Sequence, residues 1–158
     1  MSLNTTNLVI SDKDTTLHPQ NIVKRKIDQL DLRLICRKIM HISGKGWSEK
    51  KVERVSHAYK NFLFISFMYK EKATIVPTEE VDDFWHYHIL DTKKYYEDCM
   101  DIFGEMIHHS PYLGLDEKSG KQELASAFEE TKSVYLREFG KSFPEGVKAA
   151  FCNVPPQK

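Results

Sequence analysis

Cysteine is scarce in this sequence, and its three cysteines, Cys36, Cys99 and Cys152, are far apart and form no Cys-x-x-Cys pair. This argues against a disulfide framework and against an all-cysteine zinc site, so we expect a protein of the reducing cytoplasm. The sequence also lacks a Gly-x-Ser-x-Gly elbow, a cysteine-protease motif and a glycine loop for phosphate. It therefore offers little for nucleophilic catalysis or nucleotide binding.

Long hydrophobic runs are missing as well, so we expect no membrane partner. The first twenty residues are polar and have no basic start followed by an apolar block, which argues against a secretory signal. The chain of 158 residues is 41% hydrophobic and 29% charged, which is the balance of one globular domain large enough to bury a core.

The chain has no net charge, but its charge is unevenly distributed. Residues 1–76 contain 14 Lys and Arg against 7 Asp and Glu, and residues 77–158 contain 9 against 16. A basic half can indicate a nucleic-acid surface. We expect instead that the two halves pack together and offset each other's charge, because a nucleic-acid-binding domain usually carries a net basic charge.

Strand signals are nearly absent, whereas helical periodicity is strong. Apolar residues at three- and four-residue steps predict a helix over residues 20–42, stopped by the glycines of "SGKG". Ser48 is a good N-cap for a second helix, which is apolar nearly all round and therefore central. Thr78 caps a third helix, which runs from Glu79 to His108 or is broken by a new cap at Asp91 and Thr92. A fourth helix covers residues 122–139, and a short last piece covers residues 144–151.

These elements predict an all-α, single-domain bundle of four to five helices. We expect a flexible N-terminal arm over residues 1–19, the helical domain over residues 20–152 and a C-terminal tail over residues 153–158.

The third helix and the loop after it, residues 76–114, hold four of the seven histidines and eight carboxylates between Glu79 and Asp101. These side chains either surround a metal or a substrate or form the polar edge of a helical core. On a regular helix, residues two apart point about 200° away from each other, so His86 and His88 cannot face one point. Either the segment bends near Asp91, or one histidine acts with partners from elsewhere.

Better-aligned groups exist in the same segment. Asp82 and His86 are four residues apart, so this carboxylate can orient one imidazole nitrogen. His109 follows where the chain turns and could fold back onto the helix. An unbroken helix would also carry a polar stripe of His88, Asp91, Tyr95, Asp98 and Cys99. Trp85 is most simply a core residue beside these groups, and buried histidines are often only hydrogen-bonded packing residues.

The sequence resembles the glycine-rich domain-containing protein-like family over roughly residues 39–146. The pattern is carried by Val76, Pro77, Thr78, Asp82, Trp85, His86, His88, Tyr95, Asp98, Gly104 and His109, and by Glu130, Thr131, Phe139 and Gly140. The resemblance implies no settled activity, and because plant members carry their RNA-binding parts outside this domain, we expect no RNA role to carry over. It does imply that His86, His88 and His109 belong to a shared pattern, which favours a role beyond packing.

The leading hypothesis is a small cytoplasmic helical domain with a polar site that binds a divalent metal ion, zinc or iron. Its metal ligands would be His86, His88 and His109, with supporting residues Asp82, Trp85, Asp91, Tyr95 and Asp98. The alternative is a non-catalytic protein-interaction or scaffold module whose histidines form a structural hydrogen-bond network. Neither hypothesis names a substrate, and whether the domain is an enzyme stays open.

Overall fold

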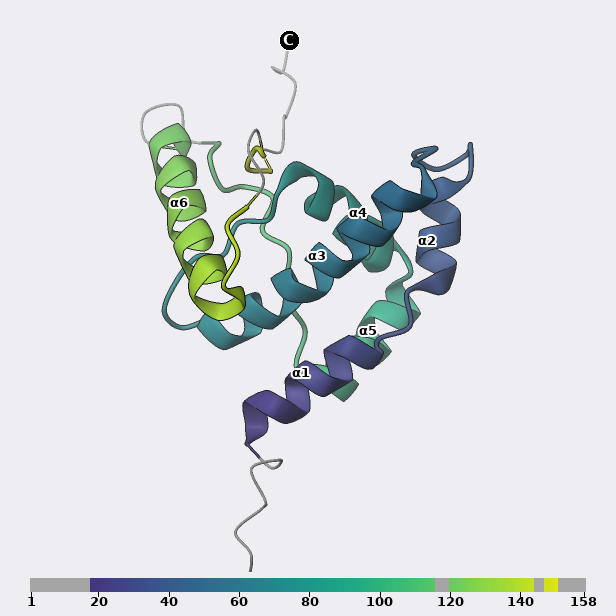
Figure 1. Ribbon diagram of the computed structural model, residues 1–158, viewed down its shortest axis with the longest axis horizontal. Helices are drawn as coiled ribbons and strands as arrows, with labels where there is room; N and C mark the ends of the chain where they lie inside the picture. The colour runs from purple at the N-terminus through teal and green to yellow at the C-terminus, as the bar shows by residue number, and fades with distance from the viewer. Residues whose placement is uncertain (1–17, 116–119, 144–146, 151–158) are drawn as a thin grey trace, which may run out of the picture.

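The computed structural model describes residues 18–115, 120–143 and 147–150, and in these residues the chain forms six α-helices and one isolated β-bridge (Figure 1). The helices are α1 (Pro19–Gln29), α2 (Arg33–Met40), α3 (Glu49–Tyr69), α4 (Glu79–Leu90), α5 (Thr92–Phe103) and α6 (Gly120–Phe139). The prediction of an all-α fold is confirmed, with more helices than the four to five expected. None of the helices in the described ranges is long and apolar enough to cross a membrane. Residues 1–17 of the predicted arm and the predicted tail lie outside these ranges.

The helix predicted over residues 20–42 is in fact two helices, α1 and α2, separated by a bend. Leu30 leaves the helical conformation with a ψ of 121°. Asp31 then accepts hydrogen bonds from the backbone N–H of Arg33 at 3.0 Å and from its guanidinium group. The bend lets Leu30 and Leu32 both enter the core, where they are 7% and 5% exposed. One continuous helix would point them to nearly opposite sides, so tertiary packing outweighs the local helical pattern.

Helix α3 is central, as its apolar sequence predicted, and contacts α1, α2, α4 and α6 (Figure 1). Ser48 caps it by accepting a hydrogen bond from the backbone N–H of Lys51 at 3.3 Å. Its side chains reach the core on more than one face, and Tyr59, Leu63 and Ile65 are each at most 2% exposed. A helix enclosed on several sides supplies the rigid wall against which α4 packs.

The predicted break in the third helix is confirmed at Asp91, which separates α4 from α5. Asp91 has a ψ of 69°, and its carboxylate accepts a hydrogen bond from the backbone N–H of Lys94 at the start of α5. Helix α5 ends earlier than predicted, because Gly104 adopts a left-handed conformation with a φ of 73°. The chain after Gly104 is irregular and turns back towards α4 with His109.

The first turn of α4 is held by two distant segments. Residues 144–146 and 151 of the predicted short last piece lie outside the described residues, and in residues 147–150 Ala149 pairs with Thr78 in an antiparallel bridge. The backbone N–H of Val76 donates to the hydroxyl of Thr131 on α6 at 2.9 Å. Since these bonds fix the chain on either side of the Thr78 cap, they also fix the start of the helix that carries the histidines.

Candidate functional site

Asp82 lies between two imidazole rings on the outer side of α4. Its Oδ1 atom is 2.8 Å from Nε2 of His109, and its Oδ2 atom is 3.3 Å from Nδ1 of His86. The two rings are close to each other, with centroids 4.6 Å apart. Asp82 and His86 meet because residues four apart share one face of a helix, whereas His109 arrives from the loop after α5.

The loop that carries His109 is anchored through Tyr95 on α5. The hydroxyl of Tyr95 donates to the backbone carbonyl of Ile107, and it accepts a hydrogen bond from Nε1 of Trp85 at 3.0 Å. The indole ring of Trp85 in turn packs on the imidazole of His109, with centroids 4.7 Å apart. Tyr95 therefore holds the backbone of this loop against α4, and Trp85 holds the imidazole ring of His109 there.

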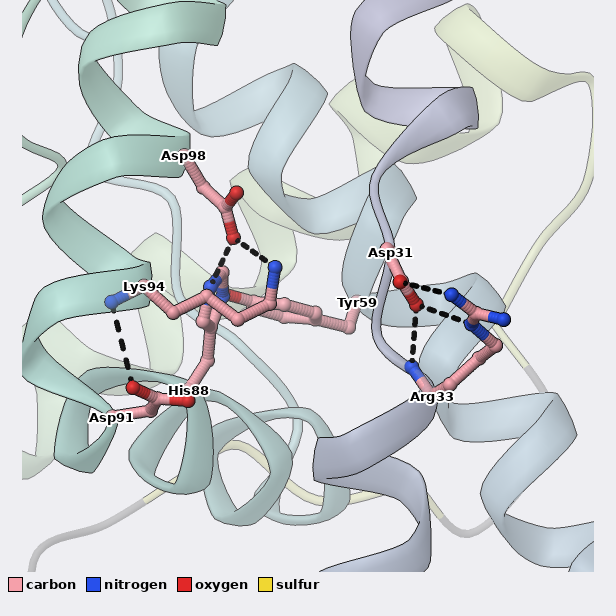
Figure 2. A network of polar contacts seen from close by, with 7 residues as sticks. All are labelled: Asp31, Arg33, Tyr59, His88, Asp91, Lys94 and Asp98. Carbon is pink, nitrogen blue, oxygen red and sulfur yellow. Dashed lines mark hydrogen bonds and ion pairs between the residues drawn. The ribbon is translucent and has the colours of Figure 1, made fainter.

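His88 belongs to a second, buried cluster on the other side of α4 (Figure 2). Its Nδ1 atom is 2.8 Å from the hydroxyl of Tyr59 on α3, and its Nε2 atom is 2.9 Å from Oδ2 of Asp98 on α5. Nζ of Lys94 lies 2.8 Å from the same carboxylate oxygen. The imidazole is 1% exposed, and Asp98 and Lys94 connect this cluster to the surface.

The partners of His88 determine its protonation. An ionised carboxylate only accepts hydrogen bonds, so Nε2 of His88 carries the hydrogen that is donated to Asp98. Burial lowers the pKa of His88 from its ordinary value of 6.5, although Asp98 opposes this shift. The ring is therefore neutral at pH 7, and its Nδ1 atom accepts the hydrogen of the Tyr59 hydroxyl. Both nitrogens of this histidine have partners.

The three predicted metal ligands are thus divided between two clusters. His86 and His109 come together around Asp82, whereas His88 lies apart with both ring nitrogens in hydrogen bonds. The break at Asp91 comes after both His86 and His88, so the turn that carries them stays helical and keeps them on different sides.

The supporting residues also take separate places. Asp82 is the centre of the first cluster, and Trp85 and Tyr95 connect it to the protein interior. Asp98 accepts from His88, and Asp91 is the N-cap of α5.

Sequence reasoning missed two members of the His88 cluster. Lys94 could have been found, because it is four residues before Asp98 and such pairs meet on a helix. Tyr59 could not, because nothing in the sequence separates it from the other large residues on the buried face of α3.

The Asp82 cluster has the chemistry of a metal site. Asp82, His86 and His109 each offer one ligand atom, and these atoms all lie within 4.8 Å of one another. Two imidazoles and one carboxylate suit zinc and iron. The side chains of Asp82 and His109 are each 14% exposed and that of His86 is 45% exposed, so two members of the cluster are largely covered and His86 opens to solvent.

A cavity of about 460 Å³ adjoins this cluster and is partly open to solvent. Asp82, Trp85 and His109 form one wall, and the chain before α4, the loop after His109 and α6 form the others. The other lining residues are Thr74, Ile75, Val76, Pro77, His108, Ser110, Pro111, Leu113, Leu124 and Ala150. The volume falls in the range of small-molecule sites in proteins.

Together these features define a small helical domain with a compact His/Asp cluster at the edge of a cavity. The model of one family, the UCP032817-like family, matches residues 23–131. The chain belongs to this family. The match begins within α1, covers α2 to α5 and ends within α6, and it includes every residue of both clusters.

The chain is also similar to glycine-rich domain-containing protein 1 from Arabidopsis thaliana, which supports the resemblance seen in the sequence. The two are 29% identical over 104 residues, and the aligned part is 63% of this chain but 12% of the plant protein. The chain thus spans about an eighth of the length of that relative. No solved structure matches the chain.

Proposed function

We propose that this helical domain binds a divalent metal ion, zinc or iron, through Asp82, His86 and His109. The observation that carries the proposal is the approach of three ligand atoms of suitable chemistry from two separate segments, all within 4.8 Å of one another. Asp82 Oδ1 and Oδ2 face nitrogen atoms of two different imidazoles. An ion at this place would bind ring nitrogens that carry no hydrogen and an ionised carboxylate, because ligating histidines are neutral and ligating carboxylates are ionised.

Packing around the cluster supports the proposal. Metal-binding histidines are usually oriented by further contacts, and His109 has one such contact at its ring and one near its backbone. The indole of Trp85 packs on its ring, and the bond from Tyr95 to the carbonyl of Ile107 holds its backbone. His86 lacks such support and is more exposed, so we assign it as the most easily released ligand of the three.

The test is metal analysis of protein purified without a histidine tag, followed by titration of the metal-free protein with Zn²⁺ and Fe²⁺. We expect one ion per chain. Asp82→Ala, His86→Ala and His109→Ala should each weaken binding at least about ten-fold, with the helical circular-dichroism signal kept. His108→Ala is the matched control, because His108 is the neighbour of His109 and lines the same cavity without joining the cluster. Absence of binding, or equal loss in the control, would contradict the proposal.

A structural role is the better account of His88 itself. Its ring is buried and both nitrogens are hydrogen-bonded to Tyr59 and Asp98, so it joins α3, α4 and α5. This matches the alternative of a histidine network that stabilises one helix packing. If the titrations show no metal binding, His86 and His109 also have a structural role, and the domain is a scaffold or protein-interaction module.

A further inference from the structure

We propose that the cavity beside Asp82 and His109 binds a small monocarboxylate, whose carboxylate group coordinates the ion and whose apolar part lies along the cavity wall. This inference rests on the proposed metal site and names the class of ligand that the site takes.

Zinc in proteins binds at least four ligands, and iron commonly binds more, whereas the cluster supplies three protein atoms. Asp82 and His109 both line the cavity. The remaining coordination positions of the ion are therefore accessible from a space that is large enough for a small molecule. A metal site that takes an exogenous ligand has such an open position, whereas a structural site is closed.

A divalent ion with two neutral imidazoles and one carboxylate leaves one positive charge at the edge of the cavity. Asp82 and His109 are mostly shielded from solvent, each 14% exposed, so this charge is only partly screened by water. A ligand with a single negative charge neutralises it. The described residues that line the cavity include no Lys or Arg, so the ion itself is the partner for the anion.

The cavity lining is more apolar than polar, and Ile75, Val76, Leu113 and Leu124 are among its residues. Val76 and Leu124 are 3% and 8% exposed and belong to a buried apolar cluster that continues into α6. Such walls favour a ligand with a hydrocarbon part, since each methylene group transferred from water adds to the affinity. A ligand with a carboxylate group at one end and a hydrocarbon part at the other therefore fits both the ion and the apolar walls.

The experiment uses the full chain loaded with Co²⁺, whose visible absorption reports changes in coordination. Acetate, hexanoate, 1-hexanol and hexylamine are titrated separately. We expect hexanoate to change the spectrum and to bind roughly ten-fold or more tightly than acetate, because its four further methylene groups contact the wall. The alcohol and the amine should bind much more weakly than hexanoate, since neither neutralises the ion.

Two variants test whether the cavity is the binding place. Leu113→Trp and Thr74→Trp place a large side chain at different parts of the lining, and Thr74 is exposed, so the fold tolerates the change there. Each should keep Co²⁺ and lose at least about ten-fold in hexanoate affinity while acetate binding changes little. Equal affinity for hexanoate and acetate, or unchanged hexanoate binding in both variants, would overturn the inference.

The two proposals fail in different ways. If Co²⁺, Zn²⁺ and Fe²⁺ do not bind at all, the metal site itself is wrong. If an ion binds with the expected dependence on Asp82 and His109 but no carboxylate changes its spectrum, the metal site stands and the ligand class is wrong.

Discussion

His86 and His88 are separated by one residue on α4, and their rings serve different clusters. The His86 ring is 45% exposed and approaches Asp82, whereas the His88 ring is 1% exposed and is hydrogen-bonded to Tyr59 and Asp98. The geometry of a regular helix requires this division, because residues two apart point about 200° away from each other. The two histidines should therefore respond differently to substitution.

We expect His88→Ala to lower the free energy of unfolding by roughly 2–4 kcal/mol, because it leaves a void and removes the partner of the buried Tyr59 hydroxyl. His86→Ala should change it by at most about 0.5 kcal/mol, since that ring is partly exposed. Urea denaturation measures both. Metal binding should show the opposite order, with His86→Ala weakening it and His88→Ala leaving it nearly unchanged. Equal destabilisation by the two variants would refute the separation of the clusters.

Tyr95→Phe tests whether the hydroxyl of Tyr95 positions His109. The change deletes one oxygen, which leaves the indole N–H of Trp85 and the carbonyl of Ile107 without this partner. We expect a loss of about 1–3 kcal/mol in stability and a roughly ten-fold loss of metal affinity.

The control for this prediction is Tyr59→Phe, which also removes a buried hydroxyl but from the His88 cluster. It should cost a similar free energy of unfolding and leave metal affinity unchanged. If both variants weaken metal binding equally, the effect comes from general destabilisation and Tyr95 has no special positioning role.

His88 should also make stability depend on pH. Its pKa in the folded protein is lowered from 6.5 by burial. As the pH falls below 6.5, the unfolded chain binds a proton at this residue before the folded chain does. The free energy of unfolding is therefore at its full value well above pH 6.5, where His88 is neutral in both states, and decreases with falling pH until the lower folded pKa is passed.

The measurement for this prediction is the difference in unfolding free energy between the wild-type protein and His88→Gln as a function of pH. Tyr59, Tyr95 and Asp98 contact the ring, Lys94 contacts Asp98, and all four are present in both proteins, so the difference reports on His88. We expect the advantage of the wild type to shrink as the pH falls from 6.5. A difference that is independent of pH would show that His88 has an ordinary pKa in the folded protein.

Gly104 ends α5 with a φ of 73°, and nothing lies within 4 Å of the place where a β-carbon would stand. Gly104→Ala should therefore cost about 1 kcal/mol from backbone conformation alone, without a steric clash. Gly104→Asn should cost less, because asparagine tolerates the left-handed region better. Thermal denaturation of both variants checks the order. A much larger loss for alanine would mean that the turn also positions the His109 loop.

Local features of the sequence determined most of the helices. Ser48, Thr78 and Asp91 are at the starts of helices in the sequence and in the structure, because a capping side chain bonds to the N–H groups of the next turn and needs no distant partner. The all-round apolar character of α3 likewise predicted its central place. These properties depend on neighbours within a few residues.

The sequence did not reveal the bend at Asp31, since it depends on the burial of Leu30 and Leu32 in a core built from other helices. It also did not reveal which histidines meet. His109 joins Asp82 across 27 residues through a loop anchored by Tyr95, and His88 meets Tyr59 across 29 residues. The positions of the helices follow from short-range bonds that the sequence specifies directly. The pairing of polar side chains depends on how whole helices pack, and only the tertiary structure decides that.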